Sequence, residues 1–503
     1  MRHLAPLFAF AAIIATVGFA CGNGKAPGNP DAGDDDAADG PLQTFSFKPA
    51  GCGYTISPPA TRAFEDLAVD DTSAPGGDIT PARVRLGLGG GTDSSDKSTY
   101  ADPHTSVSFT WETPTASHAA KVKLGTAPDT LGDLHTGYTW TTPKPTIGLS
   151  SANPKFMHEV HVCGLQPGTT YYYQVGGGPS GSETWSATQQ FTTVPATGTI
   201  TVGIQGDARD QVSTWQTVQE RMLSAGVSMQ LVVGDIVDIG TLEDLWTQWL
   251  DAIWKDPNDS AKFLTLGQQL LVPIAGNHEN EAAQFYGNWS IPGDSEQYAS
   301  FDVGNTHFVM VDDEFAQLQT DYTQAPASTI LAWLDADLKA ANQNRANVPF
   351  IVAMNHRGLF STSNHSTDGD VLAARGQLAP IFDKYAVDVV FNGHDHEYER
   401  SKPVKAGSPA TGDPVVGSVD GSSNPVSGTG TTYVICAGAG AEPYSTGEIT
   451  KSYSLKQQGF GGSTKYIGTY SILTMSANTL QVDAYGLVSS GTDDKIDSFT
   501  LTH

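Results

Sequence analysis

Five apolar, β-branched runs lie in the second half of the chain, and a short polar cluster directly follows each of them. Runs of this length and composition predict buried strands. Strands that end at one edge of a sheet bring the residues after them together, and open α/β folds bind ligands there. The runs are ITVGIQ, LVVGD, LLVPIAG, FIVAMN and VDVVFNG, and the clusters are GDARD, GDIVD, GNHEN, NHR and GHDHEYER. The pattern therefore predicts one shared site at a sheet edge.

The region before these runs reads as β-structure with hardly any helix. Apolar positions alternate at Val107, Phe109 and Trp111 in SVSFTWET, which predicts a half-buried strand. This all-β region is expected to cover residues 46–196.

The region from 197 to 503 alternates strands with helical patterns, for example at 211–225 and 328–342. Its last strands, TYSILTM and TLQVDAYG, have no helix between them. Residues 401–430 are rich in Gly, Ser, Pro and Val and predict a long surface loop.

The first twenty residues predict an export signal, with Arg2 before an apolar stretch that is too short for a stable membrane span. Cys21 then suggests the acylated cysteine of a bacterial lipoprotein, although Gly18 and Phe19 depart from the usual signal. Plain secretion is the alternative. Residues 21–45 are acidic and rich in Gly, Ala and Pro, so we expect a disordered tether.

The net charge limits which partners the protein can bind, and the cysteines bear on the compartment in which it folds. The 503 residues carry a net charge of −27, which argues against a stable nucleic-acid partner because phosphate backbones require a basic surface. In an oxidising compartment Cys52 and Cys163 could form a disulfide. Cys436 lies in an apolar run and is expected to be a small buried side chain.

The polar clusters supply carboxylate, amide and imidazole donors but no thiolate, which is typical of a site for two metal ions. Taken singly, a GDxxD cluster more often forms a turn in which the aspartate caps the next helix. All five clusters in one order favour the metal site instead. The donors are Asp207, Asp235, Asn277, His356, His394 and His396.

This ordered set resembles the calcineurin-like metallophosphoesterase superfamily over about residues 198–490, and GNHE with GHDHEYERS resembles its purple acid phosphatase branch. The stretch LQPGTTY, residues 165–171, resembles the tyrosine corner of a fibronectin type III sandwich. Such a domain precedes the catalytic domain in that branch. The resemblance implies an N-terminal all-β, fibronectin type III-like sandwich (46–196). It also implies an α/β metallophosphoesterase domain of two facing β-sheets flanked by helices (197–503).

The resemblance also implies two metal ions, of iron, zinc or manganese. Asp235 would bridge both ions. The first ion would be held by Asp207 and His396, and the second by Asn277, His356 and His394.

Two further histidines would face the substrate. His278 would be a proton donor or a phosphate contact. His365 lies nine residues after His356, where similar enzymes carry another substrate-facing histidine, but its polar surroundings fit a solvated histidine equally well.

Two positions depart from the purple acid phosphatase pattern. Asp238 stands where that branch has a tyrosine ligand. It resembles the aspartate that orients the GNHE histidine in serine/threonine phosphoprotein phosphatases, so it would hold His278; a direct ligand role is the alternative. Arg209 stands where most of the superfamily has a ligand histidine, and could either bind a substrate phosphate or pair with Asp210.

The implied function is hydrolysis of phosphomonoesters through attack by a metal-bound hydroxide, as in acid phosphatases, with a phosphorylated small molecule or another phosphoester as substrate. No GxSxG nucleophile motif is present. A phosphodiesterase or nucleotidase with the same site is the first alternative. The second is a surface binding module with a vestigial site. The expected location is the bacterial cell envelope, through an acylated Cys21, or the medium.

Overall fold

The computed structural model describes residues 45–56, 65–69, 74–92, 99–142, 155–256, 259–279, 281–292, 296–316, 326–407, 412–444, 451–462 and 464–503. The predicted export signal, Cys21 and all but the last residue of the predicted tether lie outside these residues. Within the described residues, no helix is long and apolar enough to cross a membrane.

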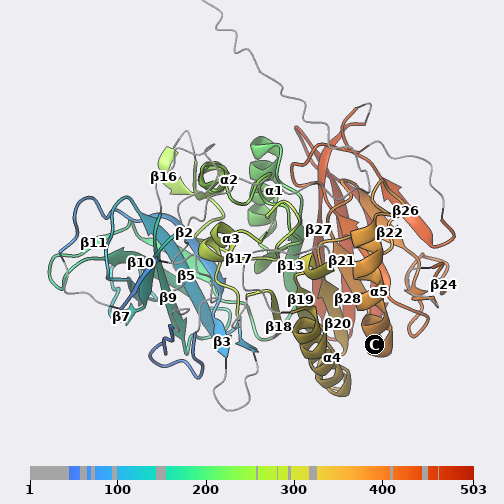
Figure 1. The fold of residues 1–503 in the computed structure, drawn as a ribbon, viewed down its shortest axis with the longest axis horizontal. Coiled ribbons are helices and arrows are strands. Elements are labelled where there is room, and N and C mark those ends of the chain that lie inside the picture. Colours follow the sequence, from blue (N-terminus) through green and yellow to red (C-terminus); the bar gives the residue numbers. More distant parts are fainter. Residues whose placement is uncertain are drawn as a thin grey trace, which may run out of the picture. The chain divides into compact units, whose positions relative to one another are not determined.

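Two large β-sheets pack against each other and helices cover their outer faces (Figure 1). The first sheet has eleven strands, in the order β1 (Glu65–Ala68), β8 (Tyr138–Thr141), β9 (Phe156–Cys163), β5 (Ser106–Thr113), β2 (Ala82–Leu88), β17 (Leu270–Pro273), β14 (Met229–Val232), β13 (Ile200–Gln205), β27 (Tyr466–Ser476), β28 (Thr479–Val488) and β29 (Asp494–Thr502). The second has seven, in the order β18 (Tyr298–Val303), β19 (Thr306–Val311), β20 (Phe350–Met354), β21 (Val389–Asn392), β25 (Thr432–Cys436), β22 (Tyr398–Ser401) and β26 (Ser454–Gln458).

The alternation of side chains along each strand explains this layering. On β20, Val352 packs into the core between the two sheets, whereas Ile351 and Ala353 pack under the helices on the other face. Both faces of these strands are therefore apolar, which is why the strands read as continuous apolar runs. The helices are α1 (Val212–Ala225), α2 (Glu243–Trp254), α3 (Ala283–Asn288), α4 (Ala327–Gln343) and α5 (Gly369–Lys384).

All five predicted strands that precede a polar cluster are present, but they do not share one sheet. Strands β13, β14 and β17 belong to the first sheet, and β20 and β21 belong to the second. The expectation of a single sheet edge was therefore wrong, because the apolar pattern marks a strand as buried without saying in which sheet it lies. The predicted helices 211–225 and 328–342 correspond to α1 and α4 within one residue at each end.

The N-terminal region adds a smaller sheet of β6 (Lys121–Gly125), β7 (Asp133–Thr136), β10 (Thr170–Gly177), β11 (Thr184–Trp185) and β12 (Gln189–Thr192). The Gln166 main-chain N–H donates to the Tyr171 hydroxyl at 2.9 Å, the contact that the tyrosine corner predicts. Cys52 and Cys163 form a disulfide, as expected for an oxidising compartment, and Cys436 is free and buried.

Strand β5 differs from its prediction, because all eight of its residues are buried rather than every second one. Val107, Phe109 and Trp111 pack into the sandwich core. On the other side of this sheet, the segment after α3 contacts the neighbouring strand β9, where Ser290 lies 3.3 Å from His161. A parallel pairing of Leu86 in β2 with Leu270 in β17 also continues the first sheet from the N-terminal region into the catalytic region.

Three two-stranded pairs complete the β-structure: β3 (Gly90–Thr92) with β4 (Thr99–Ala101), β15 (Lys255–Asp256) with β16 (Asp259–Phe263), and β23 (Val404–Lys405) with β24 (Val415–Val416). The last pair lies inside the predicted surface loop 401–430 and gives part of it regular structure.

Candidate metal centre

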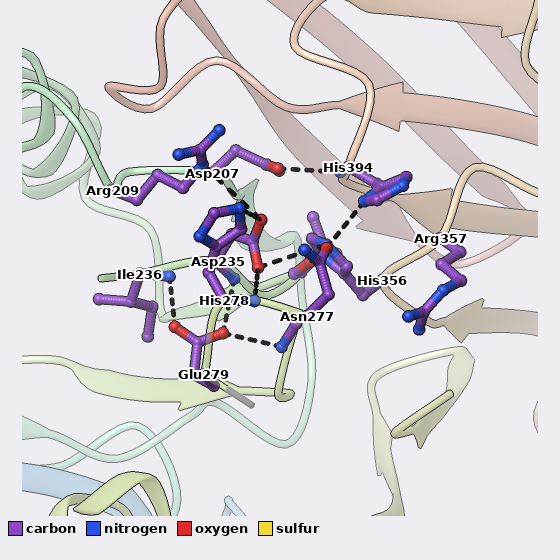
Figure 2. A network of polar contacts seen from close by, with 12 residues as sticks. Asp207, Arg209, Asp235, Ile236, Asn277, His278, Glu279, His356, Arg357 and His394 are labelled. Carbon is purple, nitrogen blue, oxygen red and sulfur yellow. Dashed lines mark hydrogen bonds and ion pairs between the residues drawn. The ribbon is translucent and has the colours of Figure 1, made fainter. Parts of the chain in front are cut away.

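The structure brings all six predicted metal ligands together between the two sheets. Figure 2 labels five of them: Asp207, Asp235, Asn277, His356 and His394. Asp207, Asp235 and Asn277 follow β13, β14 and β17 of the first sheet. The three histidines His356, His394 and His396 follow β20 and β21 of the second. The prediction of a shared site thus holds across two sheets.

Three of these residues have a left-handed backbone, with φ of 59° at Asp207, 53° at Asp235 and 72° at His394. This conformation is costly for residues other than glycine, and it collects at functional sites where the surroundings enforce it. Here hydrogen bonds from main-chain N–H groups to the two aspartate carboxylates hold the loops in this conformation. The His394 N–H donates to Asp207 Oδ1 at 2.9 Å, and the His278 N–H donates to Asp235 Oδ1 at 2.9 Å.

Two glycines in the motifs leave room for the carboxylates. A Cβ atom at Gly276 would overlap Asp235 Oδ1, and one at Gly393 would lie 2.5 Å from Asp207 Oδ2. Any larger residue would therefore displace a candidate ligand.

A first group of donors consists of Asp207, Asp235 and His396, whose potential ligand atoms all lie within 4.8 Å of one another. His396 Nδ1 lies 2.7 Å from the Glu442 carbonyl oxygen and donates to it, so Nε2 keeps a lone pair. That Nε2 lies 3.7 Å from Asp207 Oδ1. Asp207 Oδ2 is buried and has no hydrogen-bond partner among the described residues.

A second group consists of Asn277, His356 and His394. His356 Nδ1 donates to the Val233 carbonyl at 2.7 Å, so its Nε2 presents a lone pair to Asn277 Oδ1 at 3.0 Å and to Asp235 Oδ1 at 3.4 Å. His394 Nδ1 lies 2.9 Å from the same Asn277 oxygen. Lone pairs that converge in this way need a cation or a proton between them.

The pKa values of His356 and His396 agree with a metal site at this position. Burial lowers the pKa of His356, but Asp235 and Asp207 raise it well above its usual value, so a proton replaces the cation in the metal-free protein. Burial lowers the pKa of His396 to about 4, which keeps this imidazole neutral and able to bind a metal. The residues present therefore fit metal binding, and the Asp235 carboxylate lies next to both groups of donors that would hold the ions.

Glu279, the last residue of GNHE, ties two of the loops together. Its carboxylate accepts the main-chain N–H groups of Asp235 and Gly276 at 2.8 Å through one oxygen. The other oxygen accepts those of Ile236 and Val237 at 2.8 and 3.2 Å. Glu279 is not among the predicted site residues. Its place in the GNHE motif, directly after a buried strand, is the signal that could have identified it.

A buried network supports the His356 loop from behind. Asp313 Oδ2 accepts from the Asn355 side-chain amide at 2.8 Å and from the Arg357 main-chain N–H at 3.0 Å. The Arg357 guanidinium, fully buried, also pairs with Glu314 and Asp370. Neither Asp313 nor Glu314 had a sequence cue, because they lie more than forty residues before the loop that they hold.

His278 and Arg209 lie beside Asp235, and Asp238 contacts both of them. His278 Nδ1 donates to the Asp238 main-chain carbonyl at 2.7 Å and lies 3.3 Å from the carboxylate. The Asp238 carboxylate accepts from Arg209 at 2.8 Å. Arg209 also lies 3.3 Å from Asp210, the pairing that was one of its two expected roles, and phosphate binding by Arg209 stays a prediction.

The His278 imidazole is poised to carry a proton. Burial lowers the pKa of His278, but the hydrogen bond to Asp238 and the charge of Asp235 raise it to about 9. Its Nε2 faces Asp235 Oδ2 at 4.0 Å. Bound cations would oppose part of this rise because they neutralise Asp235.

His365 lies against the site rather than apart from it. Its ring centroid is 4.4 Å from that of His394, and its Nε2 lies 3.0 Å from the Tyr444 hydroxyl. Tyr444 in turn stacks on His396 at 4.1 Å. No sequence motif pointed to Tyr444, which follows β25 on a loop that also supplies the Glu442 carbonyl.

Comparison with known proteins agrees with this geometry. The family model described as "Purple acid Phosphatase, N-terminal domain" matches residues 97–193. Purple acid phosphatase 18 of Arabidopsis thaliana is 27% identical over 342 residues, which cover 65% of this chain and 68% of the relative. The chain is similar to the purple acid phosphatases.

Other relatives match over shorter spans. Purple acid phosphatase 22 of Arabidopsis thaliana is 30% identical over 49% of this chain and 54% of the relative. Acid phosphatase type 7 of Mus musculus is 25% identical over 50% of this chain and 58% of the relative. The chain thus spans more than half, but at most 68%, of the length of these relatives. Each of these relatives is named as an acid phosphatase or a purple acid phosphatase.

Two solved structures share the fold. The purple acid phosphatase PPD1 from yellow lupin seeds has a TM-score of 0.62 at 18% identity, over 84% of this chain and 74% of that one. PhoD has a TM-score of 0.56 at 13% identity, over 85% of this chain and 92% of that one. These likenesses confirm the predicted fold class, an N-terminal β region followed by an α/β phosphoesterase region.

Proposed function

We propose that this chain is an exported phosphatase that holds two metal ions and hydrolyses phosphomonoesters. The observation that carries the proposal is the convergence of lone pairs on two adjacent points, with the Asp235 carboxylate close to both groups of donors. Two bound cations would polarise the phosphate and supply an acidified water as nucleophile. The identity of the metals, among iron, zinc and manganese, is left to measurement.

The side chains around this centre have separate tasks in the proposed reaction. Arg209 offers a planar guanidinium to the nonbridging oxygens of the substrate, where negative charge builds up. His278 donates a proton to the leaving alkoxide, which is general acid catalysis. Asp238 keeps the Nδ1–H of His278 engaged through its carbonyl, so that Nε2 is the atom directed to the centre.

His365 has a contact role in this proposal. Its side chain is 29% exposed and lies between the ligand His394 and Tyr444. A substrate bound at the metal ions would lie next to His365, so His365 would touch the phosphate or its organic group.

The proposed activity is tested with purified full chain. We expect about two metal ions per chain by elemental analysis, and faster hydrolysis of an aryl phosphate than of the corresponding bis-aryl phosphate. A chelator should abolish hydrolysis, and one of the three metals should restore it. Preference for the bis-ester would instead identify a phosphodiesterase. Absence of both metal and hydrolysis would leave a binding module with a vestigial site and would refute the proposal.

The proposal that the protein is exported is supported by a disulfide and not by the metal centre. The Cys52–Cys163 disulfide is typical of proteins that fold in oxidising compartments. Lipid anchoring at Cys21 is tested by cell fractionation with a Cys21→Ser variant, which should move the protein from the membrane to the soluble fraction. An unchanged membrane fraction would contradict lipidation.

A further inference from the structure

The segment after β25 packs tightly against the loop after β13, which carries the candidate ligand Asp207. The Ala441 N–H donates to the Asp207 carbonyl oxygen at 2.7 Å. A Cβ atom at Gly440 would lie 2.5 Å from the Ala208 carbonyl oxygen, so a larger residue would push the two loops apart. We name residues 439–444 the clamp segment.

A carboxylate also fastens the clamp segment. Asp210, the last residue of GDARD, accepts the Glu442 main-chain N–H at 2.7 Å through Oδ2. Its Oδ1 lies 3.3 Å from Arg209, and Arg209 has a closer partner in Asp238, at 2.8 Å. The contact with Glu442 is thus the shorter of these two Asp210 contacts. Because the acceptor is charged, this hydrogen bond is stronger than one between neutral groups.

Glu442 is also the residue that orients the candidate ligand His396. His396 Nδ1 donates to the Glu442 carbonyl oxygen at 2.7 Å, which leaves Nε2 for a metal ion. Tyr444, at the end of the clamp segment, stacks on the same imidazole with 4.1 Å between the ring centroids and 16° between the planes. The clamp segment therefore holds His396 through both a hydrogen bond and a ring contact.

We propose that Asp210 is a positioning residue for the metal ion held by Asp207, Asp235 and His396. Its carboxylate fixes Glu442, and the Glu442 carbonyl fixes the ring of His396. Residues that orient a metal-binding histidine in this way commonly contribute about ten- to a hundredfold to metal affinity. The inference rests on the metal centre of the proposed function.

The other group of donors is oriented from elsewhere. His356 donates to the Val233 carbonyl oxygen at 2.7 Å, which lies outside the clamp segment. Loss of the Asp210 carboxylate should therefore weaken the binding of one ion and spare the other. A general loss of stability would affect both.

The proposal is tested by competition with a chelator, on the purified full chain loaded with zinc. We expect Asp210→Ala to raise the dissociation constant of one of the two ions about tenfold or more. Asp210→Asn keeps an oxygen that can accept the Glu442 N–H, so it should bind both ions like the parent. Asp420→Ala is the matched control, because it removes another exposed carboxylate that accepts main-chain N–H groups, those of Ser422 and Asn424. It should also bind both ions.

A double variant identifies the ion that is affected. Asp210→Ala combined with His356→Ala should lose both ions, because the two changes act on different groups of donors. If the double variant kept as much metal as His356→Ala alone, both changes would act on the same ion and the inference would be wrong.

The remaining outcomes separate this inference from the proposed function. Parent-like binding of both ions in Asp210→Ala would overturn the inference alone. So would the loss of both ions in that variant, or equal losses in Asp210→Ala and Asp210→Asn, since the hydrogen bond to Glu442 would then not be the cause. A parent chain that binds fewer than two ions would overturn the metal centre and this inference with it.

Discussion

At the scale of single residues, the site depends on where lone pairs point. His356 and His396 each donate one ring nitrogen to a main-chain carbonyl, which directs the other nitrogen to the centre. Both carbonyls belong to distant loops, at Val233 and Glu442. The imidazole orientation is therefore fixed before any metal binds, as metal sites with tight geometry require.

The bridging role of Asp235 is tested by metal content. Asp235→Asn should lower the occupancy of both metal sites, because its carboxylate lies next to both groups of donors. His356→Ala should deplete mainly one site. Elemental analysis of both variants beside Glu220→Gln, an exposed carboxylate outside the centre, checks this assignment. Two full metals in the Asp235→Asn protein would refute it.

The general acid is tested by the leaving group. His278→Ala should reduce turnover of alkyl phosphates about 10²-fold, and much less for aryl phosphates whose leaving groups need no proton. Asp238→Asn should have a smaller effect, because the carbonyl that accepts from His278 belongs to the main chain and survives the substitution.

Metal content should stay intact in both the His278 and the Asp238 variants. Loss of a metal in Asp238→Asn would show that this residue is a ligand. An equal loss of turnover for alkyl and aryl phosphates in His278→Ala would show that this histidine only supports Asn277.

At the scale of elements, buried acidic side chains connect segments that the sequence separates. Glu279 joins the loop after β17 to the loop after β14 through four main-chain hydrogen bonds. Asp313, after β19, holds the loop after β20. Ligand loops of this kind keep their shape because such contacts replace the missing strand hydrogen bonds.

The Glu279 contact gives a prediction about these loops. Glu279→Gln replaces one acceptor oxygen with an NH₂ group, which would face main-chain N–H donors and find no acceptor there. We expect a loss of about 1–3 kcal/mol in the free energy of unfolding and weaker metal binding, measured by denaturant titration and by competition with a chelator. The matched control is Glu220→Gln, at an exposed position on α1. Parent-like metal affinity in Glu279→Gln would contradict this role.

His307 of β19 makes a pH-dependent link to β18 and α4. It contacts Asp302 at 2.7 Å and Asp337 at 3.0 Å. Burial lowers the pKa of His307, but the hydrogen bonds to these two carboxylates raise it to about 9. Since the folded-state pKa lies above the usual 6.5, the stabilisation is complete below about pH 6.5 and is lost as pH rises through 9.

The His307 link is measured by comparing the free energy of unfolding of His307→Gln with that of the parent. The difference should be on the order of 2 kcal/mol at pH 6 and should shrink towards zero at pH 10. A difference that stays constant with pH would show that His307 acts by packing alone.

At the scale of the whole molecule, the N-terminal region and the catalytic region share one sheet. Leu86 pairs with Leu270, and Tyr173 in the small sheet donates to the Gly267 carbonyl at 2.6 Å in front of β17. The predicted boundary near residues 195–198 lies between β12 and β13, and the pairing of the two regions runs through β2 and β17 instead. The division into domains 46–196 and 197–503 stays a prediction.

The disulfide acts on the whole chain because it closes a segment of 111 residues. Replacing Cys52 and Cys163 by alanine should lower the free energy of unfolding by about 2–5 kcal/mol, since the unfolded chain regains the entropy that the bond removes. Metal content and hydrolysis should not change, because neither cysteine contacts the centre. An unchanged Tm in the double variant would contradict this expectation.

Local sequence patterns were enough to predict the strands before the polar clusters, helices α1 and α4, and the six candidate ligands. These features depend on periodicity and residue type within a few positions. Only the tertiary structure placed β13, β14 and β17 in one sheet and β20 and β21 in the other. It also decided the left-handed turns at Asp207, Asp235 and His394, and it buried both faces of β5.

The supporting contacts also came only from the tertiary structure. Glu279 lies within a motif but acts on a loop some forty residues earlier, and the Glu442 carbonyl contacts His396 through the main chain, where no residue type marks it. Tyr444 also reaches the site only through the packing of a distant loop. Contacts between distant segments follow from how the two sheets pack, and a local pattern carries no information about that packing.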